Sequence, residues 1–328
     1  MIVVTGGAGF IGSNLVASLE AAGAGDVAVV DWLGSSEKWR NLAKRSLAAL
    51  IEPDDLMAFL ERNARAIQVI FHMGAISDTT ATDADLIMRT NFTLPLALWE
   101  WCAMNGTRFI YASSAATYGD GTQGFDDLQD LASLKRLKPM NAYGWSKQAF
   151  DLRVARLIET GASRPPQWVG LKFFNVYGPN EYHKGGQRSV AHQIHEHAAV
   201  NGSCVLFKSH NPNYPDGGQL RDFVWVGDCC DVMLWLKDHP EVNGLFNLGS
   251  GKARSFADLA TAAYRANKRE PKIRYVDTPE AIREKYQYFT EAKMNRLRAA
   301  GYDKPMTELE DGVTRYVHDF LGTADPYR

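Results

Sequence analysis

The sequence Thr5-Gly6-Gly7-Ala8-Gly9-Phe10-Ile11-Gly12 follows a short apolar run, Ile2–Thr5, and precedes the helical stretch Ser13–Ala22. Glycines permit a tight turn between strand and helix, and they let the backbone approach a pyrophosphate closely. The N–H groups at the start of the helix then face the phosphate charge. The next β-branched run, Val27–Val30, ends at Asp31, an acidic residue at the distance expected for a ribose ligand. The sequence therefore predicts a dinucleotide-binding loop rather than a purely structural glycine turn.

The acidic residue and the cations that follow it favour different nicotinamide cofactors. Asp31 can accept hydrogen bonds from the ribose hydroxyls of NAD, so by itself it favours that cofactor. Lys38 and Arg40 lie just beyond it, and Lys44 and Arg45 follow. Such cations bind the additional 2′-phosphate of NADP. The residues leave both cofactors open.

The rest of the first half alternates between apolar strands and helical stretches. Strands are expected at Ala66–His72, Arg108–Ser113 and Trp168–Phe174, and helices at Asp83–Asn105 and Tyr143–Thr160. This order predicts right-handed βαβ units and an α/β fold with a Rossmann-type doubly wound parallel sheet.

After residue 174 the pattern of elements changes. We expect residues 1–174 to form the dinucleotide-binding domain and residues 175–328 mainly a smaller α/β substrate-binding lobe, with segments at about 220–252 returning to the first domain. Strands are expected at Cys204–Phe207, Phe223–Val226 and Phe246–Leu248. Helices are expected at 189–201, 228–237, 291–300, 306–320 and 255–267, the last with Ser255 as its N-cap.

Composition argues against several other classes of protein. The 328 residues are 45% hydrophobic and 23% charged with a net charge of −2, which is typical of a soluble enzyme and offers no basic surface for nucleic acid. No apolar segment reaches membrane-spanning length, and the N-terminal apolar run lacks the basic start of a signal peptide. The four cysteines show no disulfide or zinc spacing, and His192, His195 and His197 do not share one helical face. We therefore expect a cytoplasmic protein without a metal site.

A tyrosine and a lysine supply the clearest catalytic signal. Tyr143 and Lys147 lie four residues apart at the start of a predicted helix, so both side chains project from the same face. A phenol with a pKa of about 10 is a weak base at neutral pH, and a nearby ammonium and the positive nicotinamide ring would stabilise the phenolate. The run Tyr111–Gly119 leaves a strand about thirty residues earlier, and its Ser114 is expected to hydrogen-bond the substrate oxygen.

Taken together, these motifs resemble the extended short-chain dehydrogenases that act on nucleotide sugars, and in particular the ADP-L-glycero-D-manno-heptose 6-epimerases. The resemblance covers nearly the whole chain, and its most specific part is His183-Lys184-Gly185. The other stretches that carry it are 111–119, 174–179, 221–228, 246–251 and 298–305.

The resemblance implies a tightly held NADP and inversion at C6″ of the heptose by transient oxidation to an aldehyde and re-reduction, for the supply of lipopolysaccharide core heptose. It implies that Tyr143 and Lys184 act as acid/base groups for the two orientations of the oxygen, with Lys147 and Ser114 in support, in a homo-oligomer. The cofactor residues it implies are Gly6, Gly9, Phe10, Ile11, Gly12, Asp31, Trp32, Lys38, Met73, Gly74, Ala75, Asn91, Lys147, Val176 and Lys184. The substrate residues it implies are Ser114, Asn175, Gly186, Gln193, Phe207, Lys208, Arg221 and Tyr286.

The sequence departs from the family at several of these positions. Trp32 replaces an asparagine, Met73 replaces a glutamate, Gln193 replaces a histidine, and a phosphate-binding lysine is missing near Pro53. Together with a longer loop from 208 to 220, these changes leave the choice of NADP and the recognition of the heptose open.

Two other functions remain as alternatives. A UDP-hexose 4-epimerase needs the same serine, tyrosine and lysine, but it gives no role to the His183-Lys184-Gly185 segment. A catalytically inactive dinucleotide-sensing protein could lose Ser114, Tyr143 or Lys147, yet all three are present.

Overall fold

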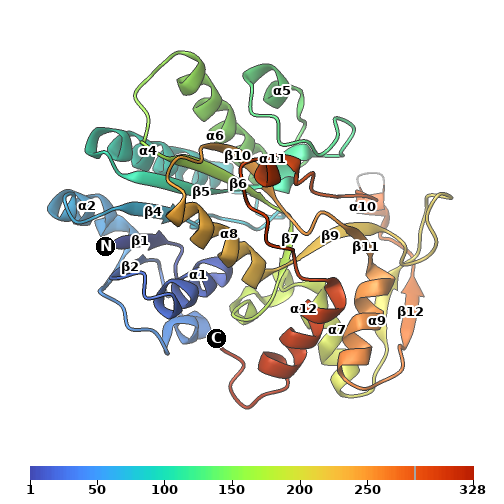
Figure 1. Cartoon of the computed structure of the whole chain (residues 1–328). Coiled ribbons are helices and arrows are strands. Elements are labelled where there is room, and N and C mark those ends of the chain that lie inside the picture. Colours follow the sequence, from blue (N-terminus) through green and yellow to red (C-terminus); the bar gives the residue numbers. More distant parts are fainter. Residues whose placement is uncertain (284–285) are drawn as a thin grey trace.

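In the computed structural model, which describes residues 1–283 and 286–328, seven parallel strands form a central sheet in the order β10-β6-β5-β4-β1-β2-β3 (Figure 1). The order of the strands reverses between β1 and β4. Strands β2 and β3 lie on one side of β1, whereas β4, β5, β6 and β10 lie on the other. The strands are β1 (Ile2–Thr5), β2 (Val27–Val30), β3 (Ala49–Ile51), β4 (Val69–His72), β5 (Arg108–Ser114), β6 (Trp168–Phe173) and β10 (Gly244–Leu248).

Both faces of this sheet are covered by helices because its strands are apolar on both sides. Val4, Val29 and Phe71 pack toward one layer, and their neighbours Val3, Val30 and Ile70 toward the other. The first layer contains α1 (Phe10–Ala21) and α8 (Val226–Asp238), and the second α2 (Leu56–Asn63), α4 (Leu94–Asn105) and α6 (Ala142–Glu159). The predicted doubly wound parallel sheet is therefore confirmed.

The long helix expected at Asp83–Asn105 is interrupted. It consists of α3 (Ala84–Met88), a π-helical turn η3 (Arg89–Thr93) and α4. Pro95 lies at the start of α4 and has no N–H to continue the regular hydrogen-bond ladder, which accounts for the wider turn before it. The side chain of Asn91, within this turn, bonds both the N–H and the carbonyl of Ile76 at 2.9 Å.

The second half of the chain adds two small sheets and returns once to the large one. One small sheet joins β7 (Asn175–Tyr177), β9 (Leu220–Trp225) and β11 (Ala253–Ser255), and the other joins β8 (Cys204–Phe207) and β12 (Ile273–Val276). Helices α7 (Val190–Ala199), α9 (Phe256–Ala266) and α12 (Leu309–Tyr316) share a separate apolar core with these strands. The return runs through α8, which packs against α1, and β10, which pairs with β6.

Most predicted elements have the expected type, with ends that shift by a few residues. The helices and strands that the sequence pattern missed are short: β3, β7, β11, β12, α2, α5 (Leu131–Arg136) and α10 (Glu280–Arg283). The predicted helices near residues 291–300 and 306–320 shorten to α11 (Asn295–Ala299) and to α12 with a terminal π turn, η6 (Val317–Leu321). No helix within the described residues combines enough length with enough apolar character to cross a membrane.

The predicted N-cap of α9 provides a test of local stability. The Ser255 hydroxyl accepts the Asp258 N–H at 2.9 Å, and the Asp258 carboxylate accepts the Ser255 N–H at 3.1 Å. Ser255→Ala should lower the free energy of unfolding by about 1 kcal/mol, measured by chemical denaturation. The exposed Ser36 also precedes a helical segment but forms no side-chain cap, so Ser36→Ala should leave stability within about 0.5 kcal/mol. Equal losses in both variants would contradict the role of the cap.

Candidate active site

The glycine loop brings two segments of backbone into direct contact. Gly6 adopts a φ of +64°, and a Cβ built there would lie 2.5 Å from Gly74 Cα at the end of β4. A Cβ on Gly12 would lie 2.1 Å from the Gly6 carbonyl oxygen. A side chain at either position would therefore displace backbone. The loop opens directly into α1, so its geometry fits the pyrophosphate of a dinucleotide.

Asp31, at the end of β2, connects the glycine loop with the first cation after it. One carboxylate oxygen accepts the Ala8 N–H at 3.0 Å, and the other pairs with Lys38 Nζ at 2.6 Å. Lys38 lies on the 3₁₀ segment η1 (Glu37–Leu42) and also donates to the Trp32 carbonyl at 2.9 Å. The carboxylate expected to bind the ribose and a cation of the kind that a 2′-phosphate needs thus lie side by side.

The remaining cations considered for the phosphate have other partners. Arg40 pairs with Glu37 at 3.2 Å, Lys44 with Asp325 at 2.9 Å, and Arg45 with Glu20 at 2.5 Å. None of the three lines the cavity described below, whereas Lys38 does. Lys38 is therefore the cation of this group that lines the cavity.

The catalytic group predicted from sequence lies where β5 ends and α6 begins. The Asn141 side chain caps α6 by accepting the Gly144 N–H at 2.8 Å, so Tyr143 lies in the first turn and Lys147 in the second. The Lys147 ammonium donates to the Ala112 carbonyl on β5 at 2.8 Å. Ser146 donates to the Tyr143 carbonyl at 2.7 Å and accepts a hydrogen bond from Asn91 at 3.0 Å. Asn91 therefore links the start of α6 to the loop after β4.

Burial changes the ionisation of the tyrosine and the lysine in opposite directions. It raises the pKa of the Tyr143 phenol, and a hydrogen bond with Ser114 opposes the increase. It lowers the pKa of the Lys147 ammonium to about 8, and the negative charge of Asp151 opposes that decrease. Lys147 therefore stays mainly protonated at neutral pH. The activation of Tyr143 by Lys147 and the nicotinamide charge stays a prediction.

The His183-Lys184-Gly185 segment forms η5 (Tyr182–Gln187), between β7 and α7. Lys184 Nζ lies 5.5 Å from the centre of the Phe10 ring, at the end of the glycine loop. Burial lowers the pKa of Lys184, and Glu181 opposes this change. Asn41 holds the segment near the loop, because its Nδ2 donates to the Ala8 carbonyl at 2.8 Å and to the Asn180 carbonyl at 3.1 Å.

A cavity of about 540 Å³ joins the glycine loop, the catalytic group and η5. It is large enough for part of a dinucleotide and a sugar. The residues expected from sequence that line it are Gly6, Gly9, Phe10, Ile11, Gly12, Asp31, Lys38, Met73, Gly74, Ala75, Ser114, Tyr143, Lys147, Asn175, Val176 and Lys184.

The other expected site residues lie outside this cavity. Trp32 is 52% exposed, Gly186 is exposed, Asn91 is buried behind the pocket, and Gln193 donates to the Arg188 carbonyl at 2.8 Å. The four remaining residues belong to one region of the second lobe. There, the guanidinium carbon of Arg221 lies 5.5 Å from the centre of the Tyr286 ring, and the centres of the Phe207 and Tyr286 rings lie 6.1 Å apart in an edge-on contact. Lys208 Nζ pairs with the Asp277 carboxylate at 3.3 Å.

Sequence reasoning also missed residues that belong to the site. Ser77 and Thr79, after β4, and Gln187, Arg188 and Phe256, in the second half, line the cavity. The hydroxyls of Ser77 and Thr79 follow the carboxyl end of a parallel strand, where ligands bind in such sheets. That position could have identified them from sequence. The residues of the second half have no comparable signal, because the fold of that lobe brings them to the cavity.

The histidines considered as metal ligands have other neighbours. His195 lies 3.2 Å from Asn267 Nδ2, His192 lies 3.1 Å from an Arg188 nitrogen, and His197 is exposed. Across residues 1–283 and 286–328, no three His, Cys, Asp or Glu side chains are arranged to hold a metal ion.

Comparisons with known proteins agree with this geometry. Residues 2–249 match the NAD dependent epimerase/dehydratase family. The ADP-L-glycero-D-manno-heptose-6-epimerase of Nitratidesulfovibrio vulgaris strain DP4 is 51% identical over 329 residues, covering 100% of both chains. The crystal structure of the Helicobacter pylori ADP-L-glycero-D-manno-heptose-6-epimerase has a TM-score of 0.76 at 28% identity and covers 96% of this chain and 94% of that chain. The Thermus thermophilus UDP-glucose 4-epimerase complex with NAD also has a TM-score of 0.76, at 25% identity, and covers 98% of this chain and 99% of that chain.

The glycine contact gives a direct test of cofactor binding. Gly12→Ala should leave the purified protein with less than about a tenth of the parent's bound nicotinamide, because the added methyl group must push α1 away from the Gly6 carbonyl. The nucleotide released by denaturation and quantified by chromatography measures this loss. In Gly186→Ala the new methyl group meets open space, so cofactor content should be unchanged. Full retention of cofactor in Gly12→Ala would contradict the assignment of this loop.

Proposed function

Because the chain belongs to the NAD dependent epimerase/dehydratase family, and within it to the ADP-L-glycero-D-manno-heptose-6-epimerases, we propose that it inverts C6″ of an ADP-glycero-manno-heptose. The protein is an enzyme, an isomerase, that uses a nicotinamide dinucleotide. The observation that carries the proposal is that Tyr143 and Lys184, two side chains able to carry a proton, line one cavity together with the glycine loop. The product would supply heptose for lipopolysaccharide.

Each residue has a defined part in the proposed reaction. A nicotinamide held at the glycine loop would supply the hydride chemistry at C6″, first as oxidant and then as reductant, so the reaction would have no net redox change. Tyr143 removes the hydroxyl proton in one orientation of the sugar, and Lys184 protonates the oxygen in the other, since the oxygen reverses direction when the aldehyde turns. Ser114 hydrogen-bonds the reacting oxygen, and Lys147 stabilises the Tyr143 phenolate. Residues 1–174 bind the cofactor, and residues 175–328 mainly bind the sugar nucleotide.

The rest of the sugar nucleotide would occupy two groups of residues. Asn175 of β7 lies at the cavity, where it can contact the heptose. Arg221 is suited to a diphosphate because a guanidinium forms paired hydrogen bonds with phosphate oxygens. Phe207 and Tyr286, next to Arg221, offer flat apolar surfaces for an adenine ring. This arrangement requires the substrate to extend from the cavity toward β8 and β9.

We propose NADP as the cofactor and a cytoplasmic homo-oligomer as the working form. Lys38, at the cavity beside Asp31, supports NADP, since a 2′-phosphate requires a cation there. Cys102, Cys204, Cys229 and Cys230 are buried free thiols, which suits a reducing compartment. The half-exposed rings of Trp32, Trp39 and Trp145 could be covered by further subunits, and sedimentation of the purified protein would test this.

The substrate can be tested without added cofactor. Purified protein incubated with ADP-D-glycero-D-manno-heptose should invert the configuration at C6″, as followed by NMR. A UDP-hexose, the substrate of the alternative 4-epimerase, should not react. Turnover of a UDP-hexose without inversion of the heptose would overturn the proposed substrate, and no turnover of either would favour the dinucleotide-sensing alternative.

The two acid/base groups can be separated by substitution. Tyr143→Phe and Lys184→Met should each reduce kcat for inversion by about 10²- to 10⁴-fold, because each removes a proton-carrying group. Lys135→Met removes an exposed lysine on α5 and should leave kcat unchanged. The rates are measured by NMR with saturating substrate. A fully active Lys184→Met would refute the assignment of a second base.

The cofactor preference can be tested through Lys38. Lys38→Met should weaken NADP binding at least about tenfold while leaving NAD binding unchanged or stronger, because it removes the phosphate ligand and releases Asp31 for the ribose. Dissociation constants for both nucleotides measured on stripped enzyme give the ratio. Arg40→Met, which removes a cation outside the cavity, is the matched control. An equal loss for both nucleotides would contradict a specific phosphate contact at Lys38.

A further inference from the structure

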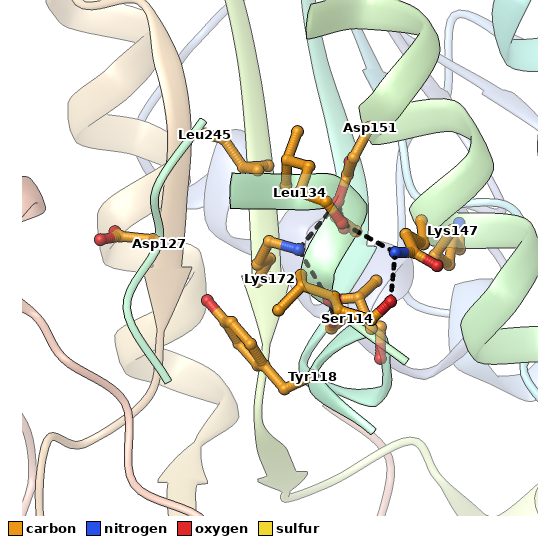
Figure 2. A network of polar contacts seen from close by, with 12 residues as sticks. Ser114, Tyr118, Asp127, Leu134, Lys147, Asp151, Lys172 and Leu245 are labelled. Atoms are coloured by element: carbon orange, nitrogen blue, oxygen red, sulfur yellow. Dashed lines mark hydrogen bonds and ion pairs between the residues drawn. The ribbon is translucent and has the colours of Figure 1, made fainter. Parts of the chain in front are cut away.

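A buried ion pair lies directly behind the catalytic residues and has no part in the mechanism described so far. Lys172 of β6 and Asp151 of α6 form a contact of 2.9 Å, and their side chains are 1% and 0% exposed (Figure 2). Burying two charges carries a large desolvation penalty, and apolar residues of similar size often give a protein that is equally or more stable. The pair therefore requires an explanation other than stability.

Asp151 lies on the same helical face as the catalytic residues. It follows Lys147 by four residues and Tyr143 by eight, which places all three along one side of α6. Its carboxylate accepts hydrogen bonds from Ser113 at 2.7 Å and from Tyr111 at 3.2 Å. Lys147 in turn donates to the carbonyl of Ala112, between these two residues of β5. Asp151 and Lys147 thus hold the same short segment of β5.

Lys172 extends the network to the catalytic serine. Its ammonium donates to the Thr117 hydroxyl at 2.6 Å, and that hydroxyl donates to the Ser114 carbonyl at 2.8 Å. Ser114 in turn caps the 3₁₀ segment η4 (Ala115–Tyr118) by accepting the Ala116 N–H at 3.1 Å. The ion pair is therefore connected through hydrogen bonds to the backbone that carries Ser114.

The other titratable groups described around Lys147 and the Lys172–Asp151 pair are neutral. Burial and the charge of Lys147 lower the pKa of His72, on β4, to about 3. Burial raises the pKa of Tyr111, on β5, well above its usual value. Tyr118, whose pKa is also raised, lies between Lys172 and Asp127, its ring 5.0 Å from the Lys172 ammonium. Among the described residues packed against Lys147, Asp151 thus supplies the opposing negative charge, and Lys172 compensates that charge from β6.

We propose that Asp151 is a positioning residue that keeps the Lys147 ammonium protonated inside the site, and that Lys172 holds the Asp151 carboxylate in place for this purpose. Burial alone favours neutral Lys147, which could not stabilise a Tyr143 phenolate. The negative charge one helical turn away offsets part of this effect. The inference rests on the proposed function only in giving Tyr143 and Lys147 their roles in proton transfer.

The protonation of Lys147 can be measured without any substrate. In holoenzyme carrying ¹³C at the lysine ε-carbons, the Lys147 signal is assigned by its loss in Lys147→Arg and followed against pH by NMR. Asp151→Asn should lower the midpoint of Lys147 by about one pH unit or more, because it removes an opposing charge close to the ammonium. Asp127→Asn, which changes a buried carboxylate bonded to the Asn247 N–H at 2.9 Å, should leave the midpoint unchanged.

Asp151→Asn leaves the buried Lys172 without its partner and can therefore prevent folding. A second variant tests the proposal in that case. Asp151→Asn with Lys172→Met removes both buried charges, so the protein should fold, and the Lys147 midpoint should still be lower than in the parent. A Lys147 midpoint equal to that of the parent, in the single variant or in the double variant, would overturn the proposal.

Turnover supplies an independent readout. In Asp151→Asn, Lys147 should lose its proton at a lower pH than in the parent. The alkaline limb of the kcat profile for heptose inversion should therefore move to lower pH by the same amount, with KM nearly unchanged. A shifted Lys147 midpoint without any heptose turnover in the parent would support the role of Asp151 and refute only the proposed substrate. A shifted midpoint with an unmoved kcat profile would show that Asp151 does not act on catalysis through Lys147.

Discussion

The contact between the Gly12 backbone and the Gly6 carbonyl determines where α1 can start, and through it the position of the whole site. Because no side chain fits between these residues, the four-residue loop 6–9 turns tightly and α1 begins close to the carboxyl end of β1. In a parallel sheet, the carboxyl ends of β2, β4 and β5 lie at the same edge. Asp31, Gly74 and Ser114 therefore reach one cavity, although they lie far apart in the sequence.

Helix α6 shows how the same scaffold controls charge. The side of α6 that faces the site carries Tyr143, Lys147 and Asp151 at successive turns. Tyr143 and Lys147 line the cavity, and Asp151 is buried behind them. Burial raises the pKa of Tyr143 and lowers that of Lys147, which favours the neutral form of both. A charged group is held there only where a partner of opposite sign is close, which accounts for Asp151 beside Lys147 and for Lys172 beside Asp151.

Much of the first half could be predicted from sequence because its signals are local. Strand β2 and the N-cap of α9 occur at the predicted residues, and the glycine loop and Tyr143…Lys147 line one cavity. The signal fails for short strands. Strand β3 has only three residues, Ala49–Ile51, which is too short for a recognisable period, and the apolar pattern of β12 is interrupted by Arg274. Residues such as Arg188 reach the cavity through tertiary folding alone. Lys172 could have been noticed, since a lysine within the apolar strand Trp168–Phe173 requires a buried partner.

The two proposed acid/base groups, Tyr143 and Lys184, also differ in how firmly the structure holds them. Tyr143 projects from the first turn of an 18-residue helix that packs on the central sheet, so its position follows from the core of the fold. Lys184 lies on a six-residue 3₁₀ segment in the second half of the chain, which is tied to the glycine loop by Asn41. An enzyme that takes a hydride from one face of a carbon and returns it to the other must let the substrate turn between these steps. A rigid group on α6 and a second group on a short, separately anchored segment satisfy that requirement, because the space between them is not filled by either element.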